Sequence, residues 1–209
     1  ISTDPDDADT RCLRAFARFS QAQFADAWPD YSTRWKSAFH EVSRSFRQPR
    51  WQGQDLVGKT LLVWGEQAVG DELMFATMAA ELLERGGRII IETEHRLQPL
   101  LARSLPGADI ITRTDPPAEQ LMSDRIDYQI PMGDLGLHLR PDMASFRRGQ
   151  PYLRADREKT AKLRGRYSAQ CGKRPRIGLS WRSGADRAGI ARSLDNEALD
   201  RLLAIHDCW

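Results

Sequence analysis

The chain has 209 residues, of which 41% are hydrophobic and 29% are charged, a composition typical of a soluble globular protein. Its 31 basic and 29 acidic residues nearly cancel and the arginines are scattered, which argues against a nucleic-acid-binding protein. No apolar run approaches the ~18 residues of a transmembrane segment, and the cysteines lie far apart without a metal-binding spacing. We therefore expect a cytoplasmic protein with unpaired thiols.

The N-terminal part, residues 1–48, carries a helical pattern and no strand signal. Apolar residues recur every three or four positions, and a break near residues 21–23 predicts two helices. The stretch FADAWPDYSTRW resembles the last unit of a tetratricopeptide array. This part is expected to be either an amphipathic helical cap on the next domain or a repeat that recruits a protein partner.

The stretch 60–87 predicts a strand, a turn and a helix. The short apolar run TLLVW is typical of a strand buried on both faces, and Gly65 and Gly70 mark the turn after it. Helical spacing starts at Asp71 and ends at Gly86, and such a unit opens a doubly wound sheet, whose ligands bind at the carboxyl ends of the strands. The expected apolar face of the helix comprises Leu73, Met74, Thr77, Met78, Ala80 and Leu82.

Further strands alternate with helices along the rest of the chain, which predicts a parallel α/β sheet. The expected strands lie at 88–92, 108–112, 127–132 and 177–181, and the expected helices at 95–105, 116–122, 154–170 and 194–205. Leu199, Leu202 and Leu203 are expected to face inward from the last helix. We predict three parts: a helical cap at 1–48, a Rossmann-like domain at 49–172 and the first strand–helix unit of a second domain at 173–209.

Two glycine-containing loops are candidates for phosphate binding. GQDLVGKT at 53–60 matches the Walker A spacing, but that loop must leave a strand and open a helix, whereas this one enters a strand. We therefore reject it and expect Lys59 to be solvated. The turn at 65–71 is placed correctly, but it carries Asp71 instead of a lysine and lacks the dinucleotide spacing G-x-G-x-x-G. This argues against a nicotinamide-dependent enzyme.

Asp71 has two compatible interpretations. An aspartate at the N-cap of a helix stabilises the helix by about 1 kcal/mol, and a carboxylate that faces a cleft from a fixed element can act as a general base. The neighbouring residues Glu66 and Gln67 are either simple turn residues or hydrogen-bonding groups that face the cleft.

Several segments in a fixed order resemble a bacterial family. QPRWQG, GKTLLVWGEQAVGDELMFATMAAELLERGGRIIIETE, PYLRAD and RPRIGLSWRSG followed by RSL are similar to tetratricopeptide-repeat proteins that carry a glycosyltransferase module of the lipopolysaccharide heptosyltransferase type. The resemblance runs from about Trp28 to the last residue. It implies a GT-B fold, in which an acceptor domain and a donor domain, both Rossmann-like, face each other, and inverting transfer from a nucleotide-sugar without a required metal or cofactor.

The resemblance also implies roles for individual residues. Gly70–Asp71 matches the family's Gly-Asp turn, which carries the catalytic base, so Asp71 is the expected base. The loop after Trp181 matches the stretch that meets the donor phosphates, although it is equally typical of a solvated basic loop. His138 is a further candidate that would face the cleft. The expected substrate-binding residues are Glu66, Gln67, Gly70, His138, Ser180, Arg182, Ser183, Gly184 and Arg192.

The sequence also departs from the family pattern. Ala68 stands where the family usually has glycine, and Ala185–Asp186 where it usually has Asn-Pro. Most of the donor domain is missing from the match, so we expect a truncated second domain, and for this chain alone weak nucleotide-sugar binding and no turnover.

Two functions remain open. One is a glycosyltransferase fragment that works on a nucleotide-sugar donor and a hydroxyl acceptor. The alternative is a non-catalytic, repeat-containing binding or scaffold module built on a Rossmann-like domain.

Overall fold

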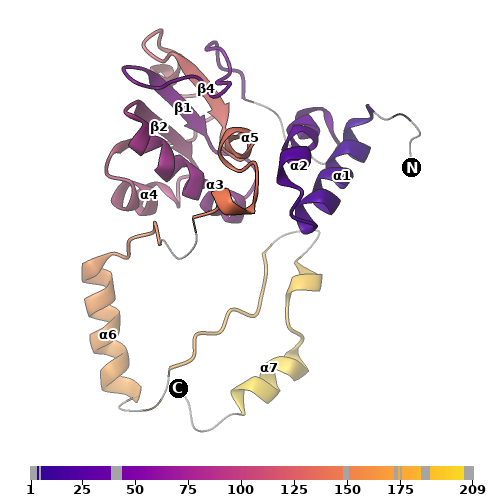
Figure 1. Cartoon of the computed structure of the whole chain (residues 1–209). Helices are drawn as coiled ribbons and strands as arrows, with labels where there is room; N and C mark the ends of the chain where they lie inside the picture. Colours follow the sequence, from indigo (N-terminus) through magenta and orange to yellow (C-terminus); the bar gives the residue numbers. More distant parts are fainter. Residues whose placement is uncertain are drawn as a thin grey trace. The chain divides into compact units, whose positions relative to one another are not determined.

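The computed structural model describes residues 4, 6–38, 44–147, 151–171, 174, 176–184 and 189–204 (Figure 1). Contacts divide the chain into two units, Ile1–Ala155 and Asp156–Trp209. The N-terminal helices thus belong to the same unit as the sheet, and the three-part division expected from the sequence stays a prediction. None of the helices in the described ranges is long and apolar enough to cross a bilayer.

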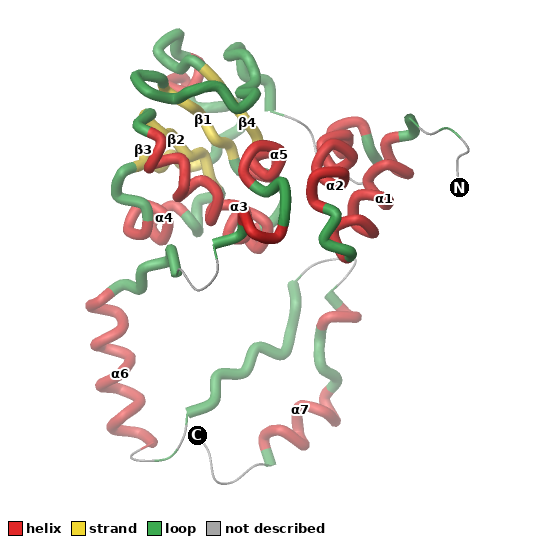
Figure 2. The backbone as a smooth tube through the Cα atoms, in the orientation of Figure 1, coloured by secondary structure: helices red, strands yellow, loops and turns green. Residues whose placement is uncertain are grey.

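The first unit is built on a four-stranded parallel sheet, drawn in yellow in Figure 2. Its strands are β1 (Thr60–Trp64), β2 (Arg88–Thr93), β3 (Ala108–Thr112) and β4 (Tyr128–Pro131). The strand order is β3-β2-β1-β4, and Leu61 of β1 is paired with Ile89 on one side and Tyr128 on the other. The α/β class and the four strands of the first unit are therefore confirmed, with a Rossmann-like parallel arrangement.

Both faces of the sheet are buried. Leu61 and Val63 lie in a core with α3 (Val69–Leu82) and α4 (Gln98–Ser104). Leu62 and Trp64 lie on the opposite face, against the short helix η3 (Glu119–Met122). Burial on both faces explains why β1 is a continuous apolar run instead of an alternating one. After α3 the chain passes through η2 (Leu83–Arg85), and Gly86 adopts a φ of 77°, a left-handed conformation that stops the helix.

The buried face of α3 agrees with the expected one only in part: Met78 and Leu82 are buried as expected, but other positions differ. Phe75, Ala76 and Ala79 are buried, whereas Met74 is 57% exposed. The sequence placed Met74 inside because apolar residues lie on several sides of this helix, so their periodicity does not separate one face from the other. The start of the helix also differs, since Ala68 is the N-cap residue and Asp71 lies in the first turn.

The N-terminal segment forms the expected helix pair. It comprises α1 (Ala8–Ser20), α2 (Phe24–Tyr31) and η1 (Ser32–Lys36), with the break at 21–23 as predicted. Asp30, which is 2% exposed, accepts hydrogen bonds from three arginines of α1 and ties the two helices together. After β4, the chain continues through η4 (Met132–Leu135), α5 (Gly136–Leu139) and η5 (Met143–Ser145).

The loop that matches the Walker A spacing is a turn leading into β1. Gly58 has a φ of 69°, and Lys59 Nζ lies 2.9 Å from Asp127 Oδ1, so the lysine is ion-paired rather than free for a phosphate. Its position at the amino ends of the strands is opposite to the edge at which parallel sheets bind ligands.

The second unit contains α6 (Arg157–Cys171), η6 (Ile190–Arg192) and α7 (Asn196–Leu203). The strand expected at 177–181 is wrong: residues 176–184 belong to no strand of the described chain. A strand forms only against a partner ladder, and the described residues of this unit supply none. Leu202 and Leu203 are 41% and 66% exposed, so the inward positions expected for them are also wrong.

Candidate functional site

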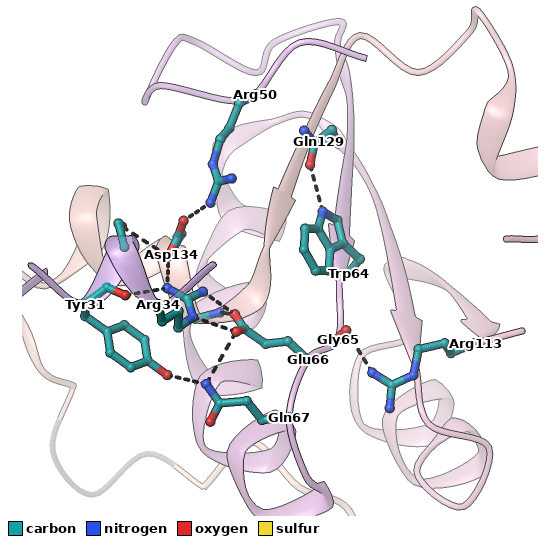
Figure 3. A network of polar contacts seen from close by, with 12 residues as sticks. Tyr31, Arg34, Arg50, Trp64, Gly65, Glu66, Gln67, Arg113, Gln129 and Asp134 are labelled. Atoms are coloured by element: carbon teal, nitrogen blue, oxygen red, sulfur yellow. Dashed lines mark hydrogen bonds and ion pairs between the residues drawn. The ribbon is translucent and has the colours of Figure 1, made fainter. Parts of the chain in front are cut away.

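An arginine of the N-terminal segment occupies the carboxyl edge of the sheet. Arg34, 3% exposed, forms a two-point contact with Glu66, Nε to Oε2 at 2.8 Å and Nη2 to Oε1 at 2.6 Å (Figure 3). Its remaining nitrogen, Nη1, contacts Asp134 Oδ1 at 2.5 Å. Arg50 pairs with the other oxygen of Asp134, and Gly133 N donates to Glu66 Oε1 at 2.8 Å. We call Arg34, Arg50, Glu66 and Asp134 the buried clamp.

The buried clamp lies where the strand order reverses. β1 has β2 on one side and β4 on the other, and the loops after such a pair of strands diverge and leave a crevice that commonly binds a ligand. Here Glu66 follows β1, Asp134 follows β4, and Arg34 bridges them. Trp35 packs on Trp64 with ring centroids 5.0 Å apart. The crevice is therefore filled by side chains of the N-terminal segment.

Two further buried carboxylates lie on the β2 side of the turn. Gly65 packs closely against the first of them, because a Cβ at this position would lie 2.5 Å from Glu72 Cδ. Glu72 accepts hydrogen bonds from Thr93 Oγ1 and Glu94 N, and Arg113 Nη2 lies 3.2 Å from its Oε1. Glu92, fully buried, is paired with Arg44. Burial raises the pKa of both glutamates, against the opposing effect of their hydrogen bonds and arginine partners.

The raised pKa of Glu72 gives a pH prediction. A carboxyl whose pKa is higher in the folded state than its ordinary 4.5 binds its proton more tightly when folded. The resulting stability is fully present below pH 4.5 and is lost as the pH rises through the pKa of Glu72 in the folded state. We therefore expect the Glu72→Gln variant to gain stability relative to the wild type as the pH rises from acid to neutral, measured by urea unfolding at each pH.

Glu84 supplies a control of opposite sign. Its exposed carboxylate accepts hydrogen bonds from Arg147, which lowers its pKa, so its contribution appears above the ordinary pKa and disappears in acid. The Glu84→Gln variant should lose stability relative to the wild type over the same pH range, by a small amount because the pair is exposed. Parallel pH trends for the two variants would contradict the assigned environments.

Asp71 borders a groove of about 530 Å³ between the N-terminal helices and α3. Its Oδ2 accepts a hydrogen bond from Ala68 N at 3.2 Å, which holds the side chain against the first turn of α3. Among the described residues, no hydrogen bond or ion pair is formed by its Oδ1. A carboxylate in the first turn of a helix is also favoured by the helix dipole. The geometry thus combines the capping role with a charge at the groove.

The other predicted residues of this turn have different environments. Glu66 is 4% exposed and both of its oxygens are engaged in the buried clamp. Gln67 has a φ of 58°, unusual for a residue with a side chain, and donates to the Tyr31 hydroxyl at 2.7 Å. Gly70 lies in α3 in open space, since a Cβ there would meet nothing within 4 Å. Gln67 and Asp71 border the groove together.

His138 is separate from the groove. It lies in α5, where its ring packs edge-on against Trp51 with centroids 5.0 Å apart, and Gly53 approaches its Nδ1. Partial burial lowers the pKa of His138, and the nearby Arg50 adds to the effect. The structure therefore places His138 in a packing contact with Trp51, in the segment that precedes β1.

Only some of the five substrate-binding residues predicted in the second unit line a common hollow. Arg182, Ser183 and Gly184 line a hollow of about 560 Å³, whereas Ser180 and Arg192 do not line it. Ser183 N donates to Ser193 Oγ at 3.0 Å, which links the two ends of the loop. Ala185–Asp186, where the sequence departs from the family, lies outside the described residues.

Comparison with known proteins finds a relative with a longer chain. The chain is 31% identical over 186 residues to protein FlbA of Caulobacter vibrioides, an alignment that covers 81% of this chain and 30% of FlbA. The chain thus spans less than a third of the length of this relative. No protein-family model matches the chain, and no solved structure matches it either.

Proposed function

We propose that the protein is a glycosyltransferase that moves a sugar from a nucleotide-sugar to an acceptor hydroxyl with inversion and without a required metal. The observation that carries this proposal is the carboxylate of Asp71, which borders a groove near the carboxyl end of β1 and keeps one oxygen without a partner in the described chain. The sequence resemblance, in which Gly70–Asp71 matches the family's catalytic turn, supports the same role.

In this proposal Asp71 is the general base. Its carboxylate accepts the proton of the acceptor hydroxyl while that oxygen attacks the anomeric carbon of the donor sugar. The bond between this carbon and the diphosphate oxygen breaks, and the electron pair leaves with the diphosphate. The first unit thus supplies acceptor activation, and the hydrogen bond from Ala68 N keeps Asp71 oriented.

The second unit is assigned to the donor. Arg182 and Arg192 would stabilise the negative charge of the leaving diphosphate, and the backbone amides of the same loop would add hydrogen bonds. Both arginines lie in stretches rich in small residues, RSG and ARS, where the backbone can approach a phosphate.

The test is turnover by the complete gene product that contains this chain. With a panel of nucleotide-sugars, we expect the Asp71→Asn variant to lose about a hundredfold or more in turnover, since a general base contributes roughly 10²–10⁴-fold. Glu119→Gln, which removes an exposed carboxylate from η3, is the matched control and should change nothing. Unchanged turnover in the Asp71 variant would remove Asp71 from the mechanism.

A non-catalytic scaffold is the second candidate, and the buried clamp favours it. The crevice that most such sheets leave for a ligand is filled here by Arg34 and Trp35. A scaffold would need the N-terminal helices fixed on the sheet, which the clamp achieves. Absence of turnover by the complete gene product with every donor tested, together with partner binding that needs α1 and α2, would favour this candidate.

A further inference from the structure

The groove beside α3 is lined almost entirely by aromatic and aliphatic side chains. Five aromatic residues come from the N-terminal helix pair, and α3 adds Met74, Phe75 and Met78 on the other side. Its volume of about 530 Å³ lies in the range of small-molecule sites. Phe16 and Met74 remain 54% and 57% exposed, so the groove is open to solvent. The five aromatic residues are Phe16, Phe19, Phe24, Trp28 and Tyr31.

The polar atoms at the groove present acceptors. Asp71 Oδ1 has no hydrogen-bond partner among the described residues, and the same holds for Gln67 Oε1, because the amide nitrogen of Gln67 is the group bound to Tyr31. Arg140 also borders the groove, but its guanidinium is ion-paired with Glu81. Among the described residues that line the groove, the charge that remains without a partner is therefore negative.

We infer that the groove binds a small organic cation, an ammonium group attached to an apolar body. The apolar body would pack on the aromatic rings, and the ammonium would donate to Asp71 Oδ1 and Gln67 Oε1. Aromatic faces also attract cations, and a charge-assisted hydrogen bond is about twice as strong as a neutral one. An ammonium brings only donors, which matches the two acceptors Asp71 Oδ1 and Gln67 Oε1.

The same features exclude the opposite chemistry. A carboxylate or phosphate on the ligand would lie beside Asp71 and be repelled by its negative charge. A neutral alcohol would pack on the aromatic rings but would not compensate the charge of Asp71. The inference does not rest on the transferase proposal, because it concerns equilibrium binding to the first unit and not turnover. Either one can fail while the other holds.

The experiment uses the 209-residue chain and three matched probes: phenylbutylamine, phenylbutanol and phenylpentanoate. By calorimetric titration at neutral pH, we expect the amine to bind at least about tenfold more tightly than the alcohol, and the acid to bind most weakly. Labelled methionine methyl groups locate the site, since the NMR signals of Met74 and Met78 should shift and that of Met143, which does not line the groove, should not.

Two variants separate the contributions. Asp71→Asn should lower the affinity for the amine to that for the alcohol. Phe16→Ala removes an exposed aromatic ring and leaves the core intact, so it should lower the affinities for the amine and the alcohol by the same factor. Glu119→Gln should leave all three affinities unchanged. Equal binding of amine and alcohol, an amine preference that survives in Asp71→Asn, or the absence of saturable binding by all three probes would each overturn the inference.

Discussion

The Arg34→Ala variant is expected to have a free energy of unfolding about 3–5 kcal/mol lower than that of the wild type. This is the range measured when one partner of a buried ion pair is removed. Arg34 holds the carboxylates of Glu66 and Asp134, which are 4% and 1% exposed. Without it, Glu66 keeps Gly133 N and Asp134 keeps Arg50 as partners, but one buried negative charge is left without compensation. The lost stability therefore comes mainly from leaving one buried carboxylate charge uncompensated.

Urea unfolding followed by circular dichroism measures this effect. The matched control is Arg88→Ala, which breaks an ion pair with Asp109 whose side chains are 64% and 50% exposed and should cost no more than about 1 kcal/mol. Arg34→Lys should recover only part of the loss, because an ammonium cannot form the two-point contact with Glu66. Equal losses for Arg34→Ala and Arg88→Ala would show that the clamp is not buried as described.

The fold of the first unit followed from local signals. Each strand is a short apolar run, the glycines mark the turns around β1 and after α3, and helices separate three of the strands, so composition and spacing were sufficient. The helix pair was also predictable, because its apolar residues recur with a helical period and stop at 21–23.

The buried clamp was not predictable in the same way. Arg34 is separated from Glu66 by 32 positions and from Asp134 by 100 positions, and local patterns carry no information about such pairs. The sequence carried a weak indication of this site, because a charged residue shortly after a strand, such as Glu66, lies at the carboxyl edge of the sheet. The sequence suggested a ligand role for Glu66, whereas the structure places it in an internal ion pair.

The second unit shows the opposite situation, in which a clear local signal did not produce the expected element. RIGLSW has the composition of a strand, but a strand depends on ladder hydrogen bonds from a neighbour. The described part of this unit contains helices and loops without a second strand. Local propensity therefore identified a segment able to pair, and the absence of a described partner explains why it remains a loop.

The Trp28→Ala variant is expected to lower the free energy of unfolding by about 3–5 kcal/mol, the usual cost of truncating a buried tryptophan. Trp28 is 7% exposed and packs edge-on against Phe19 at 4.5 Å. Its Nε1 donates to the carbonyl of Arg140 at 2.8 Å. The ring also covers Gly136 so closely that a Cβ there would lie 2.4 Å from it. Trp28 thus anchors the helix pair to the segment after β4.

Phe16→Ala is the matched control, because it removes an aromatic ring of the same helix pair that is 54% exposed, and it should cost much less. Gly136→Ala approaches the anchor from the opposite side: the added methyl group overlaps the indole and should destabilise by about 1–3 kcal/mol. The double variant Trp28→Ala/Gly136→Ala should lose less free energy of unfolding than the sum of the two single losses, because both substitutions act on one contact. Full additivity, or a Phe16→Ala loss as large as that of Trp28→Ala, would mean that the helix pair is held on the sheet by the buried clamp and not by this tryptophan.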